Sequence, residues 1–474
     1  MISLSSGANK KAATAEAETE RLITGANKKA ATAEAETERL ITGANKKAAT
    51  AEAETERLIT ATSGEVIEEY EILEGSKRKP IADTEFHKAC DEGDLVCVKR
   101  LMNNESLDVN APGSYGVTPV MWATQKGHYD VFKCLVDNGA DISCLDIFED
   151  NMLNMACIGQ NINILRYILT TDPAPDINRP RKDGRTPLMW AALQGNVDVF
   201  DYLKSKQADC LAMDNDGDNI LHYACLGGHI EMVSHIISEN IIDINRSDRY
   251  GRTALMEAAK YGHKLVFDFL LSKGGDISHK DKEGNNIFHV ACREGDLEMV
   301  GRILSQGEFD INCRGQNGKT PLLFAAFGGH RWVFDLLVRK KANASIVGSK
   351  GNNILHVACI GGHVGMVEHI LSQSMVDINS QGEDGFTSLM LAARSGRRAV
   401  FGFLVNKGAN LFQVDKKGNN ILHVACKIGS IDIVQDVLSQ HRLDINARNS
   451  RGETASMIAK RKHHMDVFNL LVKM

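Results

Sequence analysis

The feature that most constrains this chain is an internal period, visible in glycines that recur at a constant spacing. Residues 351–379, GNNILHVACIGGHVGMVEHILSQSMVDIN, recur with few substitutions, and a second, related segment lies between successive copies. The turn glycines of the two segments are Gly217, Gly284, Gly351 and Gly418, and Gly184, Gly251, Gly318, Gly385 and Gly452. The chain thus alternates two kinds of unit, of about 33 and about 34 residues, and a fixed period of this length is typical of a stacked repeat protein.

Each unit predicts two short helices. In residues 351–379, Asn353 stands at the N-cap position, where its side chain can accept a backbone N–H, and Gly361-Gly362 end the first helix. The apolar stripe resumes at Val364 for a second helix. Isolated helices shorter than about 12–15 residues are marginal in water, so one unit cannot bury its apolar face alone. We therefore expect an all-α solenoid in which every unit packs between two neighbours.

The partner unit carries the residues of a known family. At Thr186-Pro187-Leu188 the threonine is the expected N-cap, and the proline takes the first helical position, where its missing N–H costs nothing. Further motif residues are Ala191-Ala192, Gly262-His263 and Gly139-Ala140-Asp141. With these residues the chain resembles the ankyrin repeat family from residue 81 to the end, over about twelve units. The resemblance implies helix–turn–helix units joined by β-turn or hairpin loops.

The sequence divides into three regions. Residues 1–60 hold three identical copies of GANKKAATAEAETERLIT and are expected to be solvated and partly helical. Residues 61–80 form a linker, and residues 81–474 form the ankyrin repeat domain, with degenerate first, third and last units. The triplicated segment has too few large apolar residues for a core. It is interpreted either as a spacer or oligomerisation segment, or as a tandem duplication or gene-model artefact without a role.

Composition favours some kinds of partner over others. Lys and Arg number 55 against 61 Asp and Glu, which gives a net charge of -6. We expect no nucleic-acid partner from this balance. The sequence has no apolar run long enough to span a membrane and its N-terminus does not resemble a secretory signal, so no membrane insertion is expected.

Eleven cysteines raise the question of disulfide bonds or zinc. Cys225, Cys292, Cys359 and Cys426 occupy the same position in every second unit. Packed helices lie about 8–10 Å apart, so successive members are roughly twice that distance apart, whereas a disulfide needs Cα atoms within about 7 Å. These cysteines are predicted to be buried small residues of a reduced, cytoplasmic protein, with the nucleus as the alternative compartment.

Four histidines recur with the same period, at His222, His289, His356 and His423. Each stands alone in its unit, without a carboxylate or second ligand at a fixed spacing. They match the motif histidine of the family, which braces the turn by hydrogen bonds. The sequence also contains no nucleophile elbow, HExxH or Walker motif. We expect no enzyme activity, no metal, no cofactor and no small-molecule substrate.

The resemblance places partner contacts on the concave face, at the turn tips and at the two residues after the paired alanines. Those positions differ between units while the surrounding frame repeats, and they are rich in aromatic and arginine side chains, which are enriched at interfaces. The candidate protein-binding residues are Tyr250, Arg252, Lys260, Tyr261, Arg293, Glu294, Phe327, Phe386, Arg394, Lys427 and Ile428. The alternative is that Phe327 and Ile428 pack on neighbouring units and that the charges only solvate the surface.

A set of asparagines resembles those that oxygen-dependent hydroxylases modify in ankyrin repeats. Each follows Asp-Ile and lies at a fixed distance after Leu or Ile: Asn245, Asn312, Asn379 and Asn446. The alternative is an asparagine that forms the turn through local hydrogen bonds.

These observations predict a non-catalytic scaffold or adaptor that binds partner proteins on the concave face. Two other functions stay open. The chain could be a regulatory or targeting subunit of an enzyme such as a Ser/Thr phosphatase, or the ankyrin part of a larger protein whose effector domain lies beyond Met474.

Overall fold

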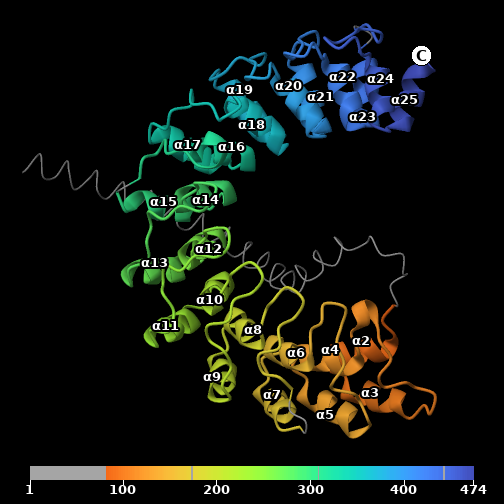
Figure 1. Ribbon diagram of the computed structural model, residues 1–474, viewed down its shortest axis with the longest axis vertical. Helices are drawn as coiled ribbons and strands as arrows, with labels where there is room; N and C mark the ends of the chain where they lie inside the picture. The colour runs from red at the N-terminus through yellow and green to blue at the C-terminus, as the bar shows by residue number, and fades with distance from the viewer. Residues whose placement is uncertain (1–81, 172–174, 308, 441–442, 474) are drawn as a thin grey trace, which may run out of the picture. The chain divides into compact units, whose positions relative to one another are not determined.

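The computed structural model describes residues 82–171, 175–307, 309–440 and 443–473 (Figure 1). The chain divides into two units, Met1–Pro80 and Ile81–Met474, and the described residues belong to the second unit. The triplicated segment at 1–60 and the linker at 61–80 lie outside the described residues, so the expectations for them stay predictions.

The described residues form twelve pairs of short α-helices, which agrees with the number of units counted in the sequence. In chain order the pairs are α2 (Glu85–Glu92) and α3 (Leu95–Met102), α4 (Pro119–Gln125) and α5 (Tyr129–Asp137), α6 (Met152–Ile158) and α7 (Ile162–Leu169), α8 (Pro187–Gln194) and α9 (Val197–Ser205), α10 (Ile220–Gly227) and α11 (Ile230–Ser238), α12 (Ala254–Lys260) and α13 (Lys264–Ser272), α14 (Ile287–Glu294) and α15 (Leu297–Ser305), α16 (Pro321–Gly328) and α17 (Arg331–Arg339), α18 (Ile354–Gly361) and α19 (Val364–Ser372), α20 (Ser388–Arg394) and α21 (Arg398–Asn406), α22 (Ile421–Ile428) and α23 (Ile431–Leu438), and α24 (Ala455–Arg461) and α25 (Met465–Val472). Two single 3-10 turns, Ser114–Gly116 and Gln316–Gly318, lie in loops.

The expected caps define the helix ends. The side chain of Asn353 accepts the backbone N–H groups of Leu355 and His356, both at 3.0 Å, at the start of α18. Gly362 ends this helix in the left-handed region, at φ +95°, where a β-carbon would be strained. In the partner units, Thr186 is the N-cap residue of α8 and Pro187 takes the first helical position. The local sequence therefore predicts where the first helix begins in each kind of unit.

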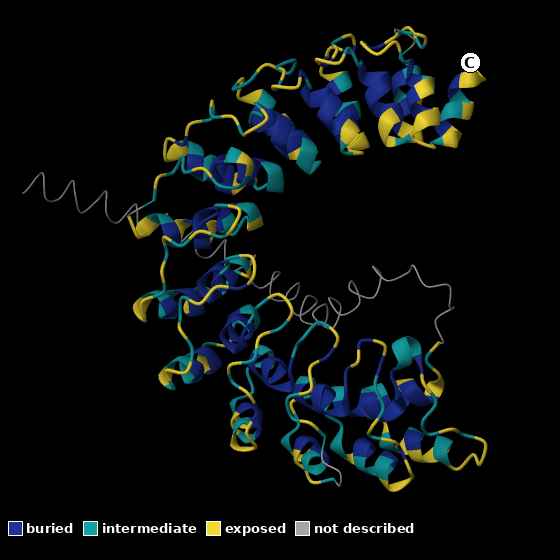
Figure 2. Ribbon diagram, in the orientation of Figure 1, coloured by how far each residue is buried: buried dark blue, intermediate teal, exposed yellow. Residues whose placement is uncertain are grey.

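The core is one continuous layer between the helices of successive units. The first helix of each pair packs against the first helices of its neighbours, and second helices pack likewise on second helices. Figure 2 shows the buried residues concentrated on the facing sides of the helices, and the exposed ones in the loops and on the outer sides of the helices. The second helices contribute fully buried phenylalanines at Phe132, Phe200, Phe267, Phe334 and Phe401. Every unit thus buries its apolar face on its neighbours, as its short helices require.

Successive turn tips are joined by backbone hydrogen bonds rather than by a sheet. Lys282 N–H donates to the carbonyl of Tyr250 at 2.8 Å, and Lys416 N–H donates to Asp384 at 2.9 Å. Within the described ranges no β-strand forms, although three isolated bridges occur, one of them between Gln381 and Thr387. The all-α solenoid predicted from the sequence is therefore confirmed.

The irregular third unit keeps the same backbone with different residues. Glu149, in place of the turn glycine, adopts φ +66°, and Gln160 adopts φ +56°. Asn161 replaces the usual histidine, caps α7, and donates from Nδ2 to the carbonyl of Gly127 at 2.9 Å. An asparagine thus makes the same kind of contact with the preceding unit that a histidine makes elsewhere.

Candidate protein-binding face

Four of the regular turn tips are organised by an aspartate, Asp214, Asp248, Asp281 or Asp415, that accepts hydrogen bonds from its own loop. Oδ1 of Asp248 accepts the backbone N–H groups of Tyr250 at 2.8 Å and Arg252 at 2.7 Å. Asp281 and Asp415 accept the matching N–H groups in their units. In these tips the aspartate therefore fixes much of the backbone conformation through local hydrogen bonds.

The recurring histidines brace the units, as the resemblance implied. Nδ1 of His356 accepts the backbone N–H of Asn353 at 3.1 Å, and Nε2 donates to the carbonyl of Ser380, in the loop leading to the next unit, at 3.0 Å. The equivalent Nε2 contacts are made by His222, His289 and His423. Burial lowers the pKa of all four imidazoles because it penalises the charged form.

A second histidine has a bracing role that the sequence interpretation missed. His263, from a Gly-His pair, donates from Nε2 to the carbonyl of Leu226 at 2.9 Å, and His330 does the same to Arg293 at 2.7 Å. The available signal was the recurrence of histidine immediately after the helix-ending glycine. Both types of histidine therefore satisfy backbone carbonyls of neighbouring units.

The periodic cysteines lie in the core. Cys225, Cys292, Cys359 and Cys426 are buried, and burial raises the pKa of each thiol. A buried thiol with a raised pKa is a poor nucleophile and a poor metal ligand. These positions confirm the prediction that the residues pack as small apolar groups.

One cluster among the described residues brings together metal-ligand atoms. One side-chain ligand atom each of Asp201, His235 and Glu239 lies within 4.8 Å of the other two. His235 Nε2 already contacts Asp201 Oδ1 at 2.7 Å, and Lys204 pairs with Glu239. The cluster is thus already paired without a metal.

The same place in the next double unit shows what this cluster is. There the equivalents of Asp201 and His235 are Asp268 and Arg302, which form an ion pair. One double unit further, Asp335 and His369 are in contact at 2.6 Å. The cluster is therefore one version of a recurring contact between successive second helices.

We call the turn tips and the C-terminal ends of the first helices the tip face. All eleven predicted binding residues lie on it, in the segment from the tip before α12 to the end of α22. They fall into three groups along the chain: Tyr250, Arg252, Lys260 and Tyr261; Arg293, Glu294 and Phe327; and Phe386, Arg394, Lys427 and Ile428.

The first group is partly engaged in its own contacts. Arg252 forms ion pairs with Asp248, at 2.6 Å, and with Glu257, at 3.4 Å, and it stabilises the tip. The Lys260 ammonium lies 4.5 Å from the ring centroid of Tyr261. Tyr250 and Tyr261 remain exposed, at 49% and 39%. The two tyrosines are therefore the accessible members of this group.

The second group combines a charged pair with a half-buried ring. Arg293 pairs with the adjacent Glu294 at 2.9 Å. Phe327 packs partly against the core, and Lys319 lies over its ring, 4.8 Å from the centroid. Phe327 thus packs against the core on one side, and Lys319 covers part of its ring.

The third group lines two hollows in the tip face. Phe386 and Arg394 contribute to both, and the guanidinium of Arg394 lies 5.3 Å from the Phe386 ring centroid. Lys427 and Ile428 are exposed and line the second hollow. The structure adds lining residues that the sequence interpretation did not select, namely Lys350, Ile360, Lys416, Lys417 and Ile458. For all of them except Ile458, which lies inside α24, the signal in the sequence was the same variability between copies at tip and helix-end positions.

The candidate hydroxylation residues connect adjacent loops. Asn245 accepts the backbone N–H of Asp276 at 2.7 Å and donates to the carbonyl of Gly274 at 3.1 Å. Asn312 and Asn379 accept the N–H of Asn343 and Asn410, both at 2.8 Å. These side-chain bonds therefore join one unit to the next rather than closing a local turn. Hydroxylation of these residues, including Asn446, stays a prediction.

The paired helices, linked tips and continuous core define a helical repeat solenoid. Family models described as ankyrin repeats match residues 59–146, 135–214, 207–281, 267–348, 334–415 and 404–459. The chain belongs to the ankyrin repeat family.

Curated proteins of several kinds are similar to the repeats. The chain is 27% identical to palmitoyltransferase AKR1 of Lachancea kluyveri over 49% of this chain and 28% of that protein. It is 27% identical to ankyrin repeat protein nuc-2 of Neurospora crassa, over 61% of this chain and 28% of that protein. It is 26% identical to transient receptor potential cation channel subfamily A member 1 of Homo sapiens, over 77% of this chain and 37% of that protein.

In these three alignments the matched part is well under half of the relative. What the chain shares with them is the repeat region. Across the described residues, no helix is both long and apolar enough to cross a membrane.

Proposed function

We propose that this chain is a non-catalytic scaffold or adaptor that binds partner proteins through the tip face. The observation that carries the proposal is that different side chains hold the repeat frame and form the exposed surface. Histidines, asparagines and tip aspartates hold the frame, while Tyr261 and Ile428 stay exposed at the ends of first helices, 39% and 41% accessible. A preformed surface of this kind limits the ordering entropy that binding must overcome.

The proposal includes several further expectations. Ankyrin repeats imply protein partners, and we infer that neither nucleic acid nor a small-molecule substrate is the natural ligand. We also infer a cytoplasmic location, with the nucleus as the alternative. The relatives named as enzymes are similar to this chain over its repeats, which gives no support for an activity of its own.

A second candidate is a regulatory or targeting subunit within a larger assembly, for example of a Ser/Thr phosphatase, or the repeat part of a longer protein. The short matched share of the relatives favours it, because their repeats accompany other regions. In both cases the tip face would still provide the contact.

The test is a pull-down that compares two variants with the native chain. Tyr261→Ala, Phe327→Ala and Arg394→Ala together remove tip-face side chains. Leu265→Ala and Trp332→Ala remove side chains on second helices that are 71% and 66% exposed. We expect partners to be lost with the first variant and kept with the second. Undiminished partners with the first variant, or equal loss with both, would overturn the assignment.

A further inference from the structure

A basic strip crosses the tip face between α18 and α24. It consists of Lys350, Arg394, Lys416, Lys417 and Lys427. The ion pairs of the surrounding units join Arg398 to Asp432 and Asp436, and Arg461 to Glu453. Within the described ranges, none of the five strip residues has a carboxylate partner. The strip is therefore a local excess of positive charge in a chain whose net charge is -6.

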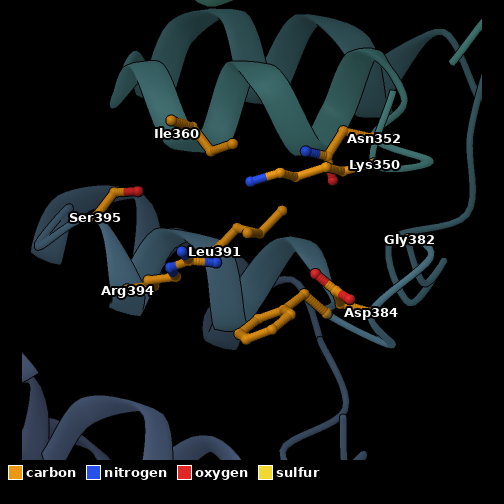
Figure 3. A pocket seen from close by; sticks show the side chains of 9 residues that line it. Lys350, Asn352, Ile360, Gly382, Asp384, Leu391, Arg394 and Ser395 are labelled. Carbon is orange, nitrogen blue, oxygen red and sulfur yellow. The ribbon is translucent and has the colours of Figure 1, made fainter. Parts of the chain in front are cut away.

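The strip surrounds two adjoining hollows with apolar surfaces. The first, of about 240 Å³, lies between α18 and α20 and includes Ile360 and Leu391 (Figure 3). The second, of about 310 Å³, lies between α20 and α22 and includes Val424 and Ile428. The hollows adjoin because both use the pair formed by Phe386 and Arg394.

Few acidic groups compete with the strip. The two hollows together contain five cationic side chains against two carboxylates, Asp384 and Asp415. Asp415 is buried, and its oxygens accept hydrogen bonds from Lys417 N–H and from the backbone and side chain of Asn419. The negative charge of Asp415 is therefore stabilised by its own loop rather than by the lysines of the strip.

We propose that these two hollows bind an extended, acidic peptide segment of a partner protein. This inference rests on the proposed function and specifies which kind of partner segment is bound. One large apolar side chain would enter each hollow, and Asp or Glu residues around them would pair with the strip. Helices pack about 8–10 Å apart and an extended chain advances about 3.3 Å per residue, so about three residues separate the two anchors.

Two observations favour a peptide over nucleic acid. One face of Phe386 is covered by Arg394, whose guanidinium lies 5.3 Å from the ring centroid, so that face is not available as a stacking platform for a base. The hollows also present apolar side chains, which suit aliphatic or aromatic anchors.

The experiment is a selection of random peptides displayed on phage, performed on the full chain. We expect enriched peptides with two large apolar residues three positions apart and acidic residues beside them. Arg394→Glu with Lys427→Glu should weaken them at least tenfold, and Lys88→Glu with Lys99→Glu, an equal charge change on α2 and α3, should not. Replacing the peptide acids by lysine should restore binding to the Arg394→Glu, Lys427→Glu variant, which shows that this variant is folded.

Other outcomes overturn the inference and separate it from the proposed function. Enriched peptides that are neutral or basic, or that bind the Arg394→Glu, Lys427→Glu variant unchanged, contradict it. Peptides lost only with Tyr250→Ala and Tyr261→Ala would leave the proposed function standing and this inference wrong. If a short single-stranded RNA binds the strip more tightly than the enriched peptides do, the ligand is nucleic acid and the inference is wrong. No enrichment of any peptide would contradict this inference, whereas the proposed function is tested separately by the pull-down.

Discussion

Nε2 of His356 donates a hydrogen bond to the carbonyl oxygen of Ser380 across 3.0 Å, and so joins one repeat to the loop that leads into the next. The same ring accepts the backbone N–H of Asn353, at 3.1 Å, through Nδ1. One neutral imidazole thus serves as donor and acceptor for two backbone groups. His222, His289 and His423 likewise contact the backbone N–H of an N-cap asparagine through Nδ1 and a carbonyl of the following loop or tip through Nε2.

His356→Ala should destabilise the array. It removes the partner of the Ser380 carbonyl and of the Asn353 N–H in a half-buried region, which costs about 1 kcal/mol per lost bond. Chemical denaturation followed by circular dichroism would measure the loss. Glu368→Ala, at an exposed position of α19, is the control and should change stability little. Equal stability of the two variants would contradict the bracing role.

The stabilising effect of His356 should depend on pH. Burial lowers its pKa from 6.5, so as pH falls below 6.5 the unfolded chain binds protons before the folded one. The contribution of the neutral ring is therefore complete above 6.5 and is lost progressively below it. The stability difference between the native chain and His356→Gln should be larger at pH 7.5 than at pH 5.0. A difference that is constant or grows on acidification would show that the ring is not held neutral.

Asp218→Asn should stabilise the protein at neutral and alkaline pH. Burial and the nearby carboxylates of Asp214 and Glu257 raise the pKa of Asp218 to about 7. The contribution of this group to stability is complete below 3.8 and is lost as pH rises through about 7. The equivalent residue Asn419 donates from Nδ2 to Asp415 Oδ2 at 2.9 Å, so an asparagine fits this place.

The measurement is a thermal melt of the native chain and Asp218→Asn at pH 8 and pH 5. The variant should melt higher at pH 8, and the gain should shrink at pH 5. Lower stability of the variant at pH 8 would mean that the pairing of Asp218 with Arg252, at 3.9 Å, outweighs its burial.

Two asparagines at the same repeat position should respond differently to alanine. Asn379 accepts the N–H of Asn410 at 2.8 Å, whereas Asn446 is exposed and precedes the last pair of helices. Asn379→Ala should cost about 1 kcal/mol through the lost bond, and Asn446→Ala should be close to neutral. Hydrogen exchange of the Asn410 amide reports the local effect. An equal loss of stability in both variants would contradict the bridging role assigned to Asn379.

Much of the fold followed from residues whose physical role is local. Asn353, Pro187 and Gly362 mark helix ends through capping, a fixed φ and a left-handed backbone, and each works without knowledge of the tertiary structure. The buried cysteines followed from spacing. The bridging role of Asn379 did not, because its partner lies in the next unit and only the stacked array brings the two together.

The candidate site was predictable as a surface but not in its details. Variation between copies indicated Tyr261 and Arg394, but it could not show that Arg252 is engaged by Asp248 and Glu257. The two hollows depend on how side chains from consecutive tips fit together. That arrangement has no signature in any one unit.

Photo-crosslinking in cells tests most directly whether the tip face binds partner proteins. A benzophenone amino acid would replace Tyr261, Phe327 or, as a control on a second helix, Trp332, which is 66% exposed. We predict discrete protein adducts at Tyr261 and Phe327 and none of these adducts at Trp332. The absence of adducts at both tip-face positions, or the same adducts at Trp332, would contradict binding through this face.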